Sequence, residues 1–179
     1  MLNEENLKQF TKKYQTDIEN VAREYCQHLF LSFLYQQAGS EKLLFKGGTA
    51  LRIIFGSPRF SEDLDFTGSG IRQKEVEELF TDALAEIERT GIGIEVREGK
   101  PTTGGYLGLI HYDAYKQSED MKFEVSLRKG GTVKGEIFTI SSELVPPYTV
   151  TQISTKQLVA GKMAALLSRK KPRDYYDLY

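Results

Sequence analysis

The sequence predicts an α/β (α+β) domain, because helical periodicity at both ends encloses a middle part of short apolar runs separated by glycine-rich turns. At 179 residues, with 40% hydrophobic and 27% charged residues, the chain has the composition of a single globular domain with a core. We assign 1–40 to N-terminal helices, 41–147 to an α/β core and 148–179 to the start of a C-terminal helical region.

The N-terminal part is helical by pattern. Apolar residues recur at helical spacing from Ile18 to Phe33, which marks one face of a helix, and Asp17 is placed to cap it. We expect a short helix around Leu7 before it, and Gly39 ends the run.

The core begins with a short apolar run at 43–45 that is typical of a buried strand, and a second strand is predicted over 63–66. Gly47 and Gly48 end the first strand, and Thr49 is predicted to cap a short helix. The remaining core elements are an amphipathic helix over 76–87 and strands over 92–96, 106–112, 121–127 and 137–140.

Proline and glycine mark the end of the core. A glycine pair at 130–131 predicts a turn, and a proline pair at 146–147 separates the core from the C-terminal region. Ser154 and Gln157 have the spacing of a capping box, so we expect a helix there that ends at Pro172. The chain stops inside the next helical pattern, which predicts a truncated C-terminal helical region.

Composition argues against several functional classes. The net charge of -1 provides no overall field for nucleic acid, so any such binding needs a local patch. Cys26 is the only cysteine, and we interpret it as a buried apolar residue rather than a nucleophile. Two histidines, His28 and His111, are too few to build a zinc site or a Ser-His-Asp triad easily. Without a signal peptide or an apolar run long enough to span a membrane, the protein is expected to be cytoplasmic.

The strongest chemical signal is the pair Asp63 and Asp65. Side chains alternate along a strand, so the two carboxylates share one face. Their repulsion, about 4 kcal/mol at about 4 Å and an effective dielectric near 20, is relieved by a divalent cation, and oxygen ligands suit Mg²⁺ or Mn²⁺. The alternative is a solvated strand face.

Gly47, Gly48 and Thr49 provide a candidate phosphate site. Glycine lets the backbone approach a phosphate, and a helix N-terminus offers free N–H groups to an anion. Lys46 precedes the glycines, so the segment is not a P-loop. A plain turn with a helix cap is the alternative.

Glu124 is a third candidate carboxylate. It alternates with apolar residues in 121–127, and its face would meet that of Asp63 and Asp65 if the strands are neighbours. A two-metal site commonly needs three carboxylates. The alternative is an exposed polar face.

The C-terminal part is basic. No acidic residue occurs from Thr151 to Arg173, and Lys162 lies near the core-facing side of its helix, where it could contact a triphosphate. The Arg-Lys-Lys run at 169–171 could contact an RNA backbone or simply form an ordinary charged helix end. Arg59, just before the aspartates, could clamp phosphate or pair with a carboxylate.

Three ordered motifs carry a resemblance to a known family. They are Lys-Gly-Gly-Thr-Ala-Leu-Arg at 46–52, Arg-Phe-Ser-Glu-Asp-Leu-Asp-Phe at 59–66 and Arg-Asp-Tyr-Tyr-Asp-Leu at 173–178. Together they resemble the AbiEii family, the nucleotidyltransferase-like toxins of abortive-infection (type IV) toxin–antitoxin systems. The resemblance implies a DNA-polymerase-β-like nucleotidyltransferase fold, with a mixed sheet flanked by helices. It also implies transfer of a nucleotide from an NTP onto RNA, in some cases tRNA 3′ ends, with Mg²⁺, and a cognate antitoxin.

The resemblance also implies roles for individual residues. The Gly-Gly-Thr segment would hold the NTP phosphates, with Lys46 and Arg59 beside it, and the two aspartates would bind metal. Lys162 would contact the triphosphate, and Asp174 would orient Lys162 or take part in catalysis. The metal role of Glu124 rests on strand alternation alone.

Two other functions remain open from the sequence. A metal-dependent nuclease would use the same carboxylates but would need no NTP pocket. A nucleotide-sensing or partner-binding module would be non-catalytic, and its effect would survive replacement of Asp63 and Asp65 by alanine.

Overall fold

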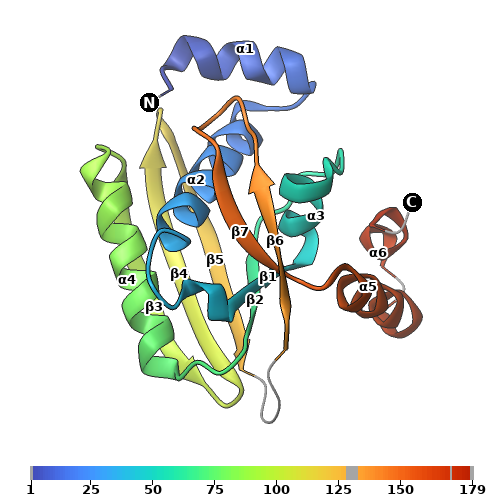
Figure 1. The fold of residues 1–179 in the computed structure, drawn as a ribbon. Helices are drawn as coiled ribbons and strands as arrows, with labels where there is room; N and C mark the ends of the chain where they lie inside the picture. The colour runs from blue at the N-terminus through green and yellow to red at the C-terminus, as the bar shows by residue number, and fades with distance from the viewer. Residues whose placement is uncertain (1, 128–132, 170, 178–179) are drawn as a thin grey trace.

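The computed structural model describes residues 2–127, 133–169 and 171–177, and this part contains a mixed sheet flanked by helices (Figure 1). Within it, seven strands run in the order β3-β4-β5-β2-β1-β7-β6. The pairs β2–β5 and β1–β7 are parallel, and the other neighbours are antiparallel. The prediction of an α/β fold with a mixed sheet is confirmed, and the predicted turn at 130–131 lies outside the described residues.

The helices and strands follow the sequence pattern closely. The helices are α1 (Glu4–Tyr14), α2 (Ile18–Leu34), α3 (Gly47–Phe55), α4 (Gln73–Arg89), α5 (Thr155–Arg169) and α6 (Pro172–Tyr176). The strands are β1 (Leu43–Lys46), β2 (Leu64–Gly68), β3 (Gly93–Thr102), β4 (Gly105–Ala114), β5 (Gln117–Leu127), β6 (Gly135–Ile140) and β7 (Tyr148–Ile153).

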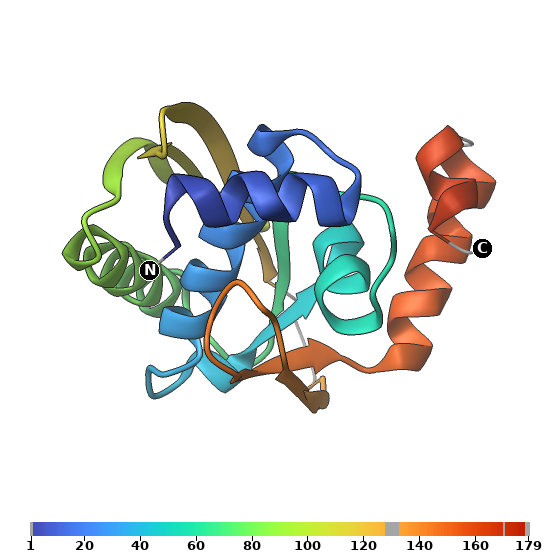
Figure 2. The same ribbon diagram turned by 90° about the horizontal axis from the view of Figure 1, so that it is seen from above.

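Phenylalanines form the core between the sheet and two helices. Phe45, Phe66 and Phe123 lie on adjacent strands and pack ring against ring. Phe30 of α2 and Phe80 of α4 contact Phe123, with ring centroids 5.4 and 5.0 Å apart. Because strand side chains alternate, the residues next to these phenylalanines face the opposite side of the sheet. Helices α5 and α6 lie together on the side of the molecule away from α4 (Figures 1 and 2).

The N-terminal helices form as their caps predict. The Asp17 side chain accepts a hydrogen bond from the Asn20 backbone N–H at 2.8 Å, which starts α2. Cys26 is buried in this helix, as the sequence indicated. The helix ends at Leu34, five residues before Gly39. Gly39 instead precedes a short 3-10 helix over Ser40–Lys42. No helix among the described residues combines the length and the apolar character needed to cross a membrane.

Two elements differ from the sequence prediction. Tyr148–Ile153 were assigned to the helical region, yet they form β7 and pair with β1 inside the core sheet. The proline pair precedes this strand, where a missing N–H disrupts no ladder. In addition, α3 starts at Gly47 with Lys46 as its N-cap, so Thr49 lies inside the first turn and is not the cap.

Candidate active site

Three charged side chains form a row across three adjacent strands. Lys46 of β1 is the register partner of Asp65 of β2, and Asp65 is the partner of Glu124 of β5. All three lie on the face opposite the phenylalanine core. Asp63 immediately precedes β2, two residues before Asp65. The strands carrying Asp65 and Glu124 are therefore neighbours, which was the condition for the third carboxylate to lie beside the aspartates.

The environment of Asp65 disfavours its charged form. Burial raises the pKa of Asp65, and the nearby charge of Asp63 raises it further. The charge of Glu124 acts in the same direction, whereas Lys46 and Lys122 oppose it. A cation placed between the two aspartates would stabilise their ionised forms.

The start of α3 packs directly against the aspartates. Gly47 has φ +86°, and a Cβ at this position would collide with the carboxylate of Asp65. At Gly48 a Cβ would lie 2.5 Å from Nη2 of Arg59 and 2.7 Å from Oγ of Ser61. Among the described residues, no side chain caps this helix. The two glycines thus allow the uncapped N-terminus of α3 to lie beside the carboxylates.

The Thr49 hydroxyl has a structural partner. Thr49 is fully buried, and its hydroxyl donates a hydrogen bond to the backbone carbonyl of Asp63. This bond ties the first turn of α3 to the start of β2. Thr49 therefore positions Asp63, and the group it can offer to a phosphate is its backbone N–H.

Glu124 is engaged by a neighbouring lysine. Lys122 forms an ion pair with the Glu124 carboxylate, and this hydrogen bond raises the pKa of Lys122. Among the described residues, no group of three or more His, Cys, Asp or Glu side chains is arranged to hold a metal ion. Asp63 and Asp65 fit an ion such as Mg²⁺, which takes one or two protein carboxylates and completes its shell with water and phosphate oxygens.

Asp177 links two of the cations of the site, Lys162 and Arg59. Lys162 of α5 donates to Oδ2 of Asp177 at 2.6 Å, and Arg59 donates to Oδ1 through Nε at 2.9 Å and Nη2 at 2.8 Å. The Asp177 side chain is 3% exposed, compared with 15% for Lys162 and 27% for Arg59. Burial opposes ionisation, but the hydrogen bonds from Lys162 and Arg59 outweigh it and hold the pKa of Asp177 below its usual range.

Sequence reasoning gave Asp177 no role and placed Asp174 next to Lys162. Asp174 is buried and accepts a hydrogen bond from the Lys171 backbone N–H at 3.2 Å. The signal for Asp177 was present, because residues three apart on a helix share a face and Asp174 was already a candidate. Both carboxylates face the same hollow.

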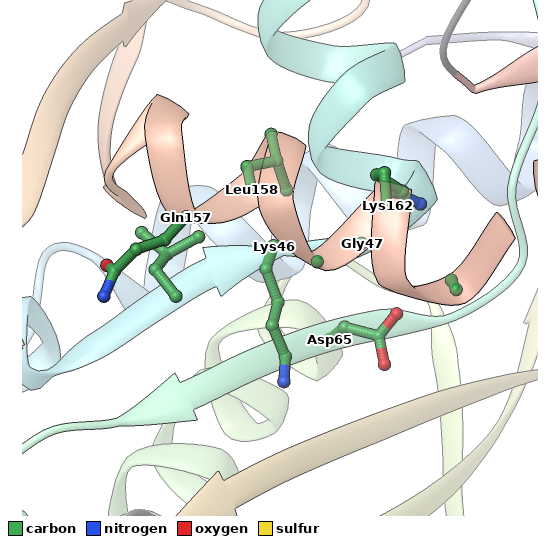
Figure 3. A pocket seen from close by; sticks show the side chains of 9 residues that line it. Lys46, Gly47, Asp65, Gln157, Leu158 and Lys162 are labelled. Carbon is green, nitrogen blue, oxygen red and sulfur yellow. The ribbon is translucent and has the colours of Figure 1, made fainter. Parts of the chain in front are cut away.

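Three adjoining hollows lie along this face. The polar hollow, about 320 Å³, is lined by Gly48, Arg59, Ser61, Asp63, Asp65, Lys122, Glu124, Lys162, Asp174 and Asp177. The α5 hollow, about 300 Å³, is lined by Lys46, Gly47, Asp65, Ile153, Gln157, Leu158, Gly161, Lys162 and Ala165 (Figure 3). The hairpin hollow, about 310 Å³, is lined by Thr102, Gly104, Leu107, Lys122, Glu124, Val125 and Ser126.

The hollows share walls. Asp65 and Lys162 line both the polar and the α5 hollow, and Lys122 and Glu124 line both the polar and the hairpin hollow. The candidate site residues of β1, β2, β5, α3, α5 and α6 are thereby brought to one groove. Lys170 lies outside the described residues.

Comparison with known structures shows the same fold elsewhere. JHP933 from Helicobacter pylori shares 22% identity and a TM-score of 0.61, over 89% of this chain and 64% of that chain. A proposed nucleotidyltransferase from H. pylori shares 21% identity and a TM-score of 0.56, over 98% of this chain and 67% of that chain. The chain thus spans about two-thirds of the length of these neighbours. Among curated proteins, no sequence matches the chain.

The likeness to these two structures shows a shared mixed α/β fold. Residues 29–179 match the family model described as nucleotidyl transferase AbiEii toxin, type IV toxin–antitoxin system. The chain belongs to this family, which confirms the resemblance drawn from its three motifs.

Proposed function

We propose that this protein transfers a nucleotide from an NTP to a hydroxyl group of RNA, with tRNA as the preferred acceptor. The observation that carries the proposal is the convergence on one polar hollow of two aspartates, the N-terminus of α3 and two cations. Phosphoryl transfer relies on positioning and on charge stabilisation, and these groups supply both.

The phosphates of the NTP would lie in the polar hollow. The backbone N–H groups at the start of α3 offer donors and a positive dipole end to an anion. Lys162 and Arg59 add two positive charges to the same hollow, where Asp177 holds them in place. These groups would stabilise the charge that develops on pyrophosphate as it leaves.

The transfer itself is a substitution at the α-phosphorus. The oxygen of the acceptor hydroxyl forms a bond to this phosphorus and loses its proton to solvent. The bond between the α-phosphorus and the bridging oxygen breaks, and pyrophosphate leaves with that electron pair.

Asp63 and Asp65 are the residues that would hold Mg²⁺ or Mn²⁺. Such an ion would neutralise phosphate charge and lower the pKa of the attacking hydroxyl. Glu124 would join them once it is released from Lys122. Asp174, buried at the edge of the same hollow, would hold the turn that presents Asp177 to Lys162.

Membership of a type IV toxin–antitoxin family implies an antitoxin as partner. We place the reaction in the cytoplasm, where a cognate antitoxin would limit modification of RNA. A nucleotide added to the acceptor end of tRNA would block that end and inhibit growth through translation.

A labelling assay tests the proposal. Each α-³²P-NTP is incubated with the protein, Mg²⁺ and total cellular RNA, beside an Asp63→Asn variant. Asp82→Asn is the matched control, because Asp82 is an exposed carboxylate on α4, which packs against the opposite face of the sheet. We expect label on one RNA class from one NTP, lost in Asp63→Asn and kept in Asp82→Asn.

Other outcomes would contradict the proposal. Degraded RNA without label would establish the nuclease alternative. Intact RNA without label, together with an unchanged growth effect of Asp63→Asn in cells, would favour a non-catalytic binding module.

A further inference from the structure

The proposed transfer uses the polar hollow and leaves the remainder of the α5 hollow without a role. It opens against Asp65 and Lys162, and Figure 3 shows Gln157 at the other end of the hollow. Asp65 and Lys162 separate the α5 hollow from the polar hollow. A molecule with its phosphates in the polar hollow could therefore extend into the α5 hollow.

The walls of the α5 hollow combine apolar and polar residues, which suits a flat group with polar edges. Ile153 of β7 and Leu158 of α5 are 3% and 5% exposed, and Ala165 lies on the same helix. Small-molecule sites combine apolar walls with a few fixed polar groups, and a volume of about 300 Å³ lies at the lower end of their range. A nucleobase with its sugar is a group of this kind.

Gln157 provides the fixed polar group. Its side-chain oxygen accepts a hydrogen bond from the Ser154 hydroxyl at 3.1 Å. This bond orients the amide and leaves its NH₂ group as a donor for the edge of a base. A glutamine side chain is suited to reading base edges because it carries both a donor and an acceptor.

Gly161 keeps the hollow open. A Cβ at Gly161 would meet no atom within 4 Å, so the fold does not require glycine here. Glycine inside an exposed helix costs about 1 kcal/mol relative to alanine. The helix gives up stability at the position where a side chain would enter the hollow, which is the expected pattern when the space serves a ligand.

We propose that the α5 hollow binds the nucleoside part of the NTP, that Gly161 makes room for it, and that Gln157 contacts the base and sets the choice of NTP. The inference rests on the proposed function, because it requires the phosphates in the polar hollow. We favour the α5 hollow over the hairpin hollow as the nucleoside site, because it shares Asp65 and Lys162 with the polar hollow that would hold the phosphates.

Titration calorimetry distinguishes binding of the nucleoside from binding of the phosphates. ATP, CTP, GTP, UTP and inorganic tripolyphosphate are titrated with Mg²⁺ into the wild type, Gly161→Leu and Gly161→Ala. We expect Gly161→Leu to weaken binding of the preferred NTP by about 10-fold or more, because leucine fills the hollow. Tripolyphosphate should bind all three proteins equally, and Gly161→Ala should bind NTP nearly as the wild type does.

Gly104→Leu is the matched control at the other end of the groove. Gly104 lines the hairpin hollow, and a Cβ there also meets no atom within 4 Å. Gly104→Leu should leave NTP affinity unchanged. A Gly161→Leu protein that folds normally and keeps its NTP affinity would overturn the inference, as would loss of affinity in Gly104→Leu alone.

Gln157→Leu tests the choice of base. We expect the affinities for the four NTPs to converge in this variant, with tripolyphosphate binding unchanged. An unchanged ranking of the four NTPs would refute the role of Gln157. If the wild type bound neither NTP nor tripolyphosphate, the proposed function itself would fail, and that result is distinct from a failure of the α5 hollow alone.

Discussion

Replacing Asp177 with asparagine removes the carboxylate that Arg59 and Lys162 share while nearly keeping its shape. The hydrogen-bond distances of 2.6 to 2.9 Å and the 3% exposure of the Asp177 side chain make this a buried ion pair. Loss of one partner from a buried pair costs about 3–5 kcal/mol, because the remaining charge stays desolvated.

Both cations of this cluster keep some access to water, so the lower end of that range applies. Lys162 is 15% and Arg59 27% exposed. A loss of about 3 kcal/mol corresponds to a decrease in Tm of about 6–12 °C for a domain of this size. Thermal unfolding followed by circular dichroism measures it, with Asp82→Asn expected to lie within about 0.5 kcal/mol of the wild type.

Tripolyphosphate supplies the diagnostic step for Asp177→Asn. Its oxygens can replace the missing carboxylate between Arg59 and Lys162, so the added anion should stabilise the variant more than the wild type. An unchanged Tm in the variant, or a smaller increase with tripolyphosphate than in the wild type, would refute this account of the cluster.

Three further predictions concern the fold and the groove. Burial, followed by the charge of Arg52, lowers the pKa of His28 to about 4, whereas an unfolded histidine titrates near 6.5. The unfolded state therefore binds more protons between these values, and roughly 3 kcal/mol of stability should be lost as pH falls from 6.5 to 4. In chemical denaturation, His28→Gln should lack this part of the loss. Gly48→Ala should fold, but its Cβ should push Nη2 of Arg59 away from the start of α3. In calorimetry it should therefore bind tripolyphosphate more weakly than the control Gly161→Ala does. Gly105→Ala should yield mostly insoluble protein, because its Cβ collides with the Val125 backbone carbonyl; a soluble variant with the wild-type Tm would contradict this.

Local patterns were sufficient to predict most elements. Helix caps such as Asp17 and the alternation of apolar residues in the strands act over a few residues, so the chain reveals them directly. The sequence does not predict the strand β7, although Tyr148 and Val150 alternate with polar residues, because the proline pair before it also indicates the end of a core. A pairing with β1, about 100 residues earlier in the chain, has no local signal.

The candidate site could be predicted only in part for the same reason. Asp63 immediately precedes β2 and Asp65 lies within it, and the sequence shows this spacing. Whether Glu124 lies beside Asp65 depends on the order of strands, which no single motif specifies. The partner of Lys162 depends on how α6 folds back against α5, so the contact with Asp177 required the tertiary structure.

Charge balance in the groove leads to a last prediction about metal. The described charged residues lining the polar and α5 hollows are the cations Lys46, Arg59, Lys122 and Lys162 and the carboxylates Asp63, Asp65, Glu124, Asp174 and Asp177. The carboxylates outnumber the cations by one, so a free triphosphate gains little from the overall charge of the groove. A divalent cation on Asp63 and Asp65 would reverse this balance where the phosphates lie. We therefore expect the NTP affinity of the wild type, measured by calorimetry, to fall about 10-fold or more when EDTA replaces Mg²⁺. In Asp63→Asn the affinity with Mg²⁺ should already be low, so the same exchange should lower it far less. Equal affinity with and without Mg²⁺ in the wild type would show that the α3 N-terminus and the cations suffice, and would remove the metal from the binding step.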